Sequence, residues 1–457
     1  MTISVYVQAV WFLAALLFIY GLKCMSSPVS ARKGIVWAGY GMLIAIAGTF
    51  FITGLQNFVL MGTALFIGAA LAWISGKKVK MTDMPQMVAI YNGMGGGAAA
   101  AIAAIEFTKG HHLGLLVTSL AVVGALIGAV SFTGSCVAFA KLQGLMHKTY
   151  RLPAQNLMNL FLAVGAITLG IVLIINAPAH ANLILLFFLV ALILGVIITL
   201  PIGGADMPVV ISLFNAFTGL AVALEGYVLG NPALIVAGVF VGAAGTMLTQ
   251  LMAKAMNRPI SNVLFTQMVA ADASDGEITG SMKEIGAMDA AAMMRYASKV
   301  IIVPGYGMAV AHAQHKVCEI TKMLEDIGVE VKFAIHPVAG RMPGHMNVLL
   351  AEAGVSYDNI FDLEEINEEF SQADVALIIG ANDVVNPAAR SNKSSSIYGM
   401  PILNADYAQN VIVIKRGKGT GYSGIENVLF YTDNCHMLYG DAQPVVSEII
   451  QNLKTMS

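Results

Sequence analysis

Residues 300–310, VIIVPGYGMAV, indicate the fold of the second half of the chain. Its apolar beginning is typical of a short buried strand, and Gly305-Tyr306-Gly307 predicts a tight turn into a helix. Gly305 permits the turn, and Gly307 allows a phosphate to approach the backbone N–H groups at the helix start. Because Val310 occupies the third position of the motif, an ordinary strand-to-helix turn remains an alternative.

Further short apolar runs alternate with helical patterns in this half of the chain. Strands are expected at 299–303, 329–335, 375–379 and 411–414, with a shorter candidate at 436–439. This alternation is typical of a parallel sheet with helices on both faces, so we place an α/β Rossmann-like domain at residues 288–457. Ligands of such sheets bind outside the carboxyl ends of the strands.

Charged side chains at two strand ends indicate which ligand this sheet binds. The second strand runs into His336 and later Arg341 without a carboxylate, which disfavours NAD because its ribose 2′-hydroxyl usually meets an acid there. The strand VIVI ends at Lys415 and Arg416, before the glycine-rich GKGTGYSG. Two cations at this place suit a 2′-phosphate, although a basic pair beside glycines is often only a solvated loop.

The fourth strand ends in Asn382 and Asp383. The commoner role of these residue types at such a place is to cap the following turn. A carboxylate beside a phosphorylated cofactor would repel it unless the carboxylate is protonated or hydrogen-bonded. We therefore predict Asp383, with Asn382, as the candidate catalytic residues and Asp383 as a proton-sensing group.

The first half of the chain has the composition of a membrane protein. Of the 457 residues, 57% are hydrophobic and 11% are charged, against roughly 25% charged in a soluble protein. Nine apolar stretches are long enough to cross a bilayer. They lie near 3–22, 35–53, 57–75, 85–106, 114–140, 155–176, 181–200, 207–229 and 232–253. We expect a transmembrane domain at 1–258 and a polar linker at 259–287.

The distribution of Lys and Arg predicts the orientation. If the C-terminal domain is cytoplasmic, the loops on that side contain 11 Lys and Arg residues and the opposite loops contain only Lys109. The net charge of −2 gives no indication of nucleic-acid binding. Four scattered cysteines without a Cys-x-x-Cys pair argue against a metal site.

Two membrane helices begin alike, with DMPQMVAIYN at 83–92 and DMPVVISLFN at 206–215. Asn92 and Asn215 would lie about 13 Å along their helices, close to mid-membrane. Polar groups at that depth are costly unless they pair or line water. The predicted proton path therefore comprises Asn92, Asn215, Ser131 and Asp206. The alternative is that the amides only hydrogen-bond neighbouring helices and the hydroxyls their own backbone.

Each of these helices is followed by one with glycines four residues apart, which predicts close helix contacts. They are Gly124 and Gly128 in one case, and Gly238 and Gly242 in the other. Asparagine cannot titrate and no histidine lies inside a span. The proton is therefore expected to travel by water or by a group outside this chain.

Five stretches closely resemble the beta subunit of proton-translocating nicotinamide nucleotide transhydrogenase, over essentially the whole chain. They are HPVAGRMPGHMNVLLAEA, GANDVVNPAA, VIVIKRGKGTGY, MTDMPQMVAI and IGGADMPVV. The resemblance implies that this chain binds NADP(H) and that a partner alpha subunit with further transmembrane helices binds NAD(H). Hydride transfer between them would be coupled to proton translocation, favouring NADPH formation under a proton-motive force. It also implies a dimer of heteromers in the lipid of the bacterial inner membrane.

The resemblance also implies the residues of the cofactor site. Tyr306 and its glycines would cover the pyrophosphate, 338–343 would form a loop beside the cofactor, 380–384 the nicotinamide side, and 417–422 a lid. The implied set is Gly305, Tyr306, Gly307, Val338, Ala339, Gly340, Arg341, Met342, Pro343, Gly380, Ala381, Asn382, Asp383, Val384, Lys415, Arg416, Gly417, Lys418, Gly419, Thr420, Gly421, Tyr422, Gly440, Asp441 and Ala442. No metal is implied. Some members carry histidine in place of Asn92, so a partner helix is expected to supply the titrating group.

Two other functions remain open from the residues alone. One is an ion channel or secondary transporter whose cytosolic domain only senses nucleotide. The other is a membrane-tethered dehydrogenase without ion movement. Hydride exchange in membranes, with and without an uncoupler, distinguishes them.

Overall fold

The computed structural model divides the chain into two compact units, one of residues 1–202 and 210–249 and the other of 203–209 and 250–457. It describes residues 4–52, 54–109, 114–146, 150, 152–176, 180–203, 206–257, 259–261, 281–342, 344–392, 395, 397–417, 419–421 and 423–456. The predicted linker 259–287 lies largely outside these residues.

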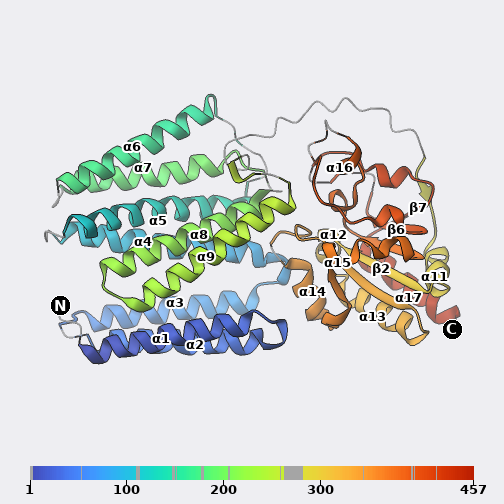
Figure 1. Cartoon of the computed structure of the whole chain (residues 1–457), viewed down its shortest axis with the longest axis horizontal. Coiled ribbons are helices and arrows are strands. Elements are labelled where there is room, and N and C mark those ends of the chain that lie inside the picture. The colour runs from blue at the N-terminus through green and yellow to red at the C-terminus, as the bar shows by residue number, and fades with distance from the viewer. Residues whose placement is uncertain are drawn as a thin grey trace. The chain divides into compact units, whose positions relative to one another are not determined.

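In the part of the chain that the structure describes, nine long helices form the first unit, and in Figure 1 they run along a common direction. They are α1 (Val5–Met25), α2 (Pro28–Thr49), α3 (Phe58–Lys78), α4 (Met84–Thr108), α5 (Leu115–Leu142), α6 (Gln155–Ile175), α7 (Ala181–Thr199), α8 (Met207–Val228) and α9 (Pro232–Ala255). Within the described residues, eight are long and apolar enough to cross a membrane. The exception is α2, which starts earlier than expected and includes Arg32 and Lys33. The chain is a multi-pass membrane protein.

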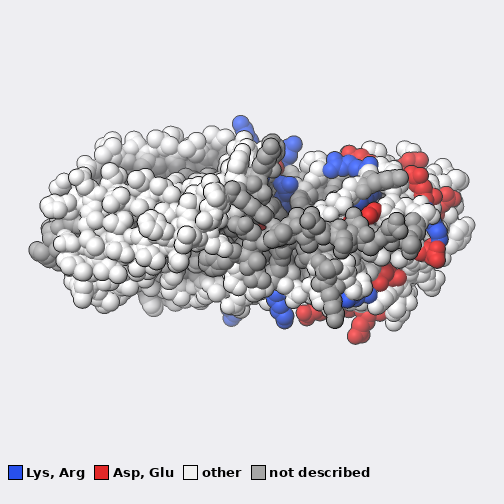
Figure 2. Space-filling view, turned by 90° about the horizontal axis from the view of Figure 1, so that it is seen from above, with Lys and Arg blue, Asp and Glu red and all other residues white. Residues whose placement is uncertain are grey.

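Surface charge distinguishes the two units. Figure 2 shows almost only uncharged residues over the helices, whereas acidic and basic residues are interspersed over the sheet unit. An uncharged exterior suits helices whose surroundings are lipid, because a charged side chain in hydrocarbon is costly.

Glycines allow the close helix contacts that the sequence predicts. A Cβ atom at Gly128 of α5 would lie 2.7 Å from the Gly96 carbonyl oxygen of α4. Between α8 and α9, Gly219 and Gly238 each lie so close to the facing backbone that a side chain would collide with it. The helices therefore approach at a distance that larger residues would prevent.

Seven parallel strands form the sheet of the second unit, in the order β1-β7-β6-β5-β2-β3-β4. The strands are β1 (Lys283–Glu284), β2 (Lys299–Pro304), β3 (Glu330–Ile335), β4 (Ile360–Asp362), β5 (Val375–Ile379), β6 (Asn410–Lys415) and β7 (Cys435–Tyr439). The five predicted strands are confirmed. The two missed ones are edge strands of two and three residues, too short to show an alternating pattern.

Both faces of the sheet are covered, as the apolar strands predict. The longer helices, α11 (Ala287–Arg295), α13 (Gln314–Asp326) and α17 (Ala442–Met456), pack together on one face. The other face is covered by single turns and short helices, which bury Phe370 and Phe430 against Ile301 and Val411. The remaining helices are α12 (Tyr306–Val310), α14 (His345–Ala353), α15 (Leu363–Ile366) and α16 (Ala388–Ser391).

The strand order reverses its direction between β2 and β5. From β2 the chain proceeds outward through β3 and β4 on one side, and from β5 outward through β6 and β7 on the other. A reversal of this kind leaves a crevice at the carboxyl ends of the two central strands, and ligands of open α/β sheets bind there.

Candidate functional site

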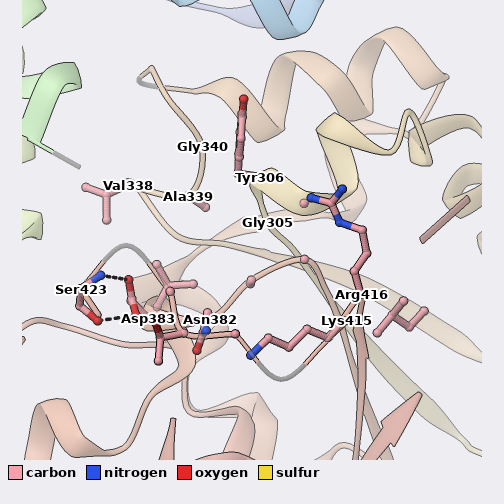
Figure 3. Close-up of a pocket in the computed structure, with 18 of the residues that line it drawn as sticks. Gly305, Tyr306, Val338, Ala339, Gly340, Asn382, Asp383, Lys415, Arg416 and Ser423 are labelled. Atoms are coloured by element: carbon pink, nitrogen blue, oxygen red, sulfur yellow. Dashed lines mark hydrogen bonds between the residues drawn. The ribbon is translucent and has the colours of Figure 1, made fainter. Parts of the chain in front are cut away.

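A pocket lies at the carboxyl ends of the strands and is lined by the loops that follow β2, β3, β5, β6 and β7 (Figure 3). The predicted residues that line it are Gly305, Tyr306, Gly307, Val338, Ala339, Gly340, Arg341, Gly380, Ala381, Asn382, Asp383, Val384, Lys415, Arg416, Gly417, Gly419, Thr420, Gly421, Gly440, Asp441 and Ala442. Met342 is not among its lining residues. Pro343, Lys418 and Tyr422 lie outside the described residues.

The glycines after β2 are needed for packing against the loop after β5. The N–H of Gly305 donates to the Ile379 carbonyl at 2.9 Å, and that of Gly307 to the Gly380 carbonyl at 3.0 Å. A Cβ atom at Gly305 or Gly380 would collide with the facing backbone. The Gly307 N–H is therefore already bonded to a carbonyl oxygen, and the helix that contains it, α12, has only five residues.

A buried histidine shapes the loop after β3. His336 is 1% exposed. Its Nε2 lies 2.7 Å from the Pro401 carbonyl oxygen, and its Nδ1 accepts from the Val338 N–H at 3.2 Å. Burial lowers the pKa of His336 to about 4, and the bond to Pro401 opposes this shift. The neutral ring, with the proton on Nε2, satisfies both bonds.

Because the pKa of His336 is lowered, we expect the sheet unit to lose stability in acid. Because the pKa of His336 is about 4 in the folded chain and about 6.5 when unfolded, the unfolded state binds more protons between these values. The neutral ring contributes its full stabilisation above pH 6.5. The free energy of unfolding falls by about 3 kcal/mol as the pH is lowered towards 4. Hydrogen exchange of the β3 amides in the full chain measures this slope. His336→Gln should make it shallower, and an unchanged slope would contradict the assignment.

A second histidine supports the aromatic and cationic wall of the pocket. The Nδ1 of His345 accepts from the Arg341 N–H at 3.1 Å, and a Cβ atom at Gly340, where φ is 113°, would lie 2.7 Å from the same nitrogen. The Arg341 guanidinium carbon lies 4.4 Å from the centre of the Tyr306 ring. The loop after β3 thereby places a cation over the tyrosine that follows β2.

Asp383 joins the loop after β5 to the loop after β6. Its carboxylate accepts from the Ser423 N–H at 3.0 Å and from the Ser423 hydroxyl at 2.7 Å (Figure 3). Gly421 lies directly against the carboxylate, with no room for a side chain. A change in the charge of Asp383 therefore acts on the contact between two loops of the pocket.

Two buried asparagines that were not predicted from the sequence also connect the loops after β5 and β6. Asn427, 1% exposed, donates to the Asn382 carbonyl at 3.0 Å, and Asn386, fully buried, donates to the Glu426 carbonyl at 3.2 Å. Ser423 was also missed as a pocket residue, although it lies in the glycine-rich stretch that marked the site. Nothing in the local sequence distinguishes these asparagines from ordinary turn residues.

The two cations at the end of β6 extend in different directions. In Figure 3 the Arg416 side chain extends towards Gly305, and that of Lys415 towards Asn382. The Lys415 ammonium lies 4.6 Å from the centre of the Phe430 ring. Burial lowers the pKa of Lys415, while the charges of Asp383 and Glu426 oppose this shift. Among the described residues, neither cation takes part in a salt bridge, so both are available to an anionic ligand.

The predicted membrane residues lie at corresponding positions of two helices. Asn92 and Asn215 are each the ninth residue of α4 and α8. Asn92 donates to the Ser135 hydroxyl at 3.0 Å. Ser131 donates to the Phe214 carbonyl at 2.9 Å and lies 2.6 Å from the Thr218 hydroxyl. These hydroxyls therefore connect helices.

Of the four predicted proton-path residues, Asn92 and Ser131 are connected by hydrogen bonds through Thr218. Asn215 is half-buried, in contrast to the buried Asn92, and Asp206 directly precedes α8. The connected polar group consists of Asn92 and Ser131 with two residues that were not predicted, Ser135 and Thr218.

Comparison with known proteins agrees with this combination of membrane helices and nucleotide-type sheet. The sequence model of the family described as NAD(P) transhydrogenase beta subunit matches residues 7–452. Two curated relatives, one from Rhodospirillum rubrum and one from a designated strain of it, are named NAD(P) transhydrogenase subunit beta. Each is 46% identical over 461 residues, covering 97% of this chain and 98% of the relative. The chain therefore belongs to the NAD(P) transhydrogenase beta subunit family.

Proposed function

We propose that this chain is the NADP(H)-binding and proton-conducting subunit of its transhydrogenase. Hydride would pass between NAD(H) on a partner alpha subunit and NADP(H) on this chain, coupled to proton translocation across the bacterial inner membrane. A proton-motive force would favour NADPH formation. The sheet unit would lie in the cytoplasm, and the assembly would be a dimer of heteromers.

The observation that carries the choice of NADP(H) is the pair of cations at the end of β6. Lys415 and Arg416 line the pocket at the carboxyl end of a core strand, and neither is neutralised by a salt bridge with another described residue. At the end of β3 the chain continues into the buried His336, where an NAD site usually has an acid. These residues fit a ribose 2′-phosphate, because Arg offers a planar fork and Lys a point charge.

The other pocket residues would hold and orient the cofactor. Tyr306 with the Arg341 guanidinium would cover the pyrophosphate. The loop at 380–384 would lie on the nicotinamide side, and the stretch 417–422 would form a lid over the cofactor. The nicotinamide rings supply the redox chemistry when bound. The protein would exclude water and align the two cofactors, because positioning is the part of the reaction that its groups can supply.

Coupling requires two conformations of the chain with different affinity for NADP(H) and different access to protons. The membrane potential supplies about 2.3 kcal/mol per charge per 100 mV. We propose that protonation of Asp383 biases this equilibrium, because its carboxylate holds two pocket loops together through Ser423. Asn92, Asn215, Ser131 and Asp206 would belong to the membrane path, and the linker at 259–287 would connect the units.

The proposal is tested with membranes that contain this chain and its alpha partner. NADPH and an oxidised NAD analogue are mixed, and hydride exchange is followed with and without an uncoupler. We expect exchange whose rate changes when the uncoupler is added. Exchange that is indifferent to the uncoupler would identify a transhydrogenase without ion movement, and absence of exchange would contradict NADP(H) chemistry on this chain.

A further inference from the structure

A buried carboxyl group lies inside the helical unit, on a helix that the sequence analysis singled out only for its asparagine. Glu225, near the end of α8, is 1% exposed. Both of its carboxyl oxygens are buried and lack a hydrogen-bond partner among the described residues. An ionised carboxylate without donors is costly in an apolar interior, so such a group takes up a proton or meets a mobile donor such as water.

The space beside Glu225 is made by a glycine. A Cβ atom at Gly124 of α5 would lie 2.5 Å from Oε1 of Glu225. The titratable group facing it from α4 is Glu106, whose side chain is 14% exposed and pairs with Lys109 at 2.5 Å. Gly226, the next residue of α8, lies against Leu234 and Ile235 of α9. Glu225 is thus buried beside the small residue Gly124, and the charged pair of Glu106 and Lys109 lies at the end of α4.

Polar groups lead towards Glu225 from the other end of the same helices. The Thr218 hydroxyl lies 2.6 Å from that of Ser131 and 3.4 Å from the Asn92 carbonyl oxygen. Oδ1 of Asn92 is a second buried acceptor without a partner among the described residues. Glu225 follows Thr218 by seven residues, about 10 Å along α8. The acceptors without a partner at both levels can each accept a hydrogen bond from water.

We propose that Glu225 is the proton-carrying group of this chain's membrane path, which rests on the proposed proton-conducting function. In each cycle the carboxylate would gain a proton through one new O–H bond and release it by breaking that bond, with no change in oxidation state. Water ordered by Asn92, Ser131 and Thr218 would connect it to one side, and the Glu106–Lys109 pair would lie on the other. The titrating group then belongs to this chain, and no partner helix has to supply it.

The test uses Glu225→Gln in the complete complex, reconstituted with its partner subunit in lipid vesicles. The amide has the shape of the acid but cannot carry a proton. Proton translocation should fall at least about tenfold, since a positioned proton-transfer group contributes roughly 100-fold or more. NADPH affinity should stay within about twofold of the wild-type value, which also shows that the variant folds. Glu225→Asp should retain measurable translocation.

Two further measurements separate proton transfer from packing. Ser212→Ala, on the same helix but bonded to Gly245 of α9, should translocate protons at close to the wild-type rate. Infrared difference spectra of the wild type should contain a carboxylic-acid C=O band that is lost in Glu225→Gln. A smaller loss in Glu225→Gln, an equal loss in Ser212→Ala, or a band that persists would overturn the role of Glu225. Absence of translocation in the wild type would overturn the proposed function itself.

Discussion

Replacing Lys415 and Arg416 together by alanine is expected to weaken NADPH binding by roughly 100- to 1,000-fold and to change NADH binding by less than about threefold. Removing the partners of a bound charge typically costs about 3–4 kcal/mol, and each 1.4 kcal/mol is a factor of ten. NADH lacks the 2′-phosphate that these side chains would bind. Titration of both nucleotides into the purified full-length variant measures the two affinities.

Single substitutions show how much each of the two cations contributes to NADPH affinity. Arg416 is exposed at the strand end, whereas Lys415 lies over Phe430 near the acids Asp383 and Glu426. We therefore expect Arg416→Ala to cause the larger loss, and Arg416→Lys an intermediate one because charge remains without the planar fork. Lys322→Ala, which removes an exposed cation from α13, is the matched control. A comparable loss in that control would mean that net charge, and not the site, sets the affinity.

Asp383→Asn is expected to abolish the proton dependence of NADPH release and to reduce coupled transhydrogenation at least about tenfold. The carboxylate accepts two hydrogen bonds from Ser423. Hydrogen bonds to charged groups contribute about 1.5–3 kcal/mol each, so their loss or weakening can shift a loop equilibrium by about tenfold. The amide cannot change its charge with pH. NADPH release rates measured across neutral pH, in the complex with its partner, check this result.

Ser423→Ala tests whether the contact between Asp383 and Ser423 only holds the two loops together or also makes NADPH release depend on pH. This variant removes the hydroxyl bond to Asp383 but keeps the carboxylate and the backbone bond. We expect weaker NADPH binding with the pH dependence preserved. Proton-dependent release and full pumping in Asp383→Asn would refute the role given to its carboxylate.

The sequence predicts those parts of the structure that depend on local pattern. Long apolar runs and short buried strands identify the helices and the sheet, because burial on all sides leaves a continuous apolar signal. The loops that line the pocket are predicted for the same reason, since their positions follow from the strand ends. The edge strands β1 and β4 form because they pair with β7 and β3. This pairing leaves no pattern in the local sequence.

Individual contacts depend on residues distant in sequence and could not be predicted. The sequence predicts that Gly307 permits a close approach to the backbone, but not that its own N–H bonds to the carbonyl of Gly380, which follows another strand. The role of Ser423 emerges only beside Asp383. Glu225 lies within a predicted span, but its burial against Gly124 requires α5 and α8 to be placed together. Inside the spans, only asparagine and histidine were considered as titrating groups, and this glutamate was not singled out from the sequence.

In the proposed function the pocket of the sheet unit selects NADP(H) over NAD(H). Equilibrium binding of both reduced nucleotides to the purified wild-type chain, in the same detergent and buffer, measures this selectivity directly. We expect NADPH to bind at least about 100-fold more tightly than NADH, which corresponds to roughly 2.7 kcal/mol. Equal affinities for the two nucleotides would contradict it.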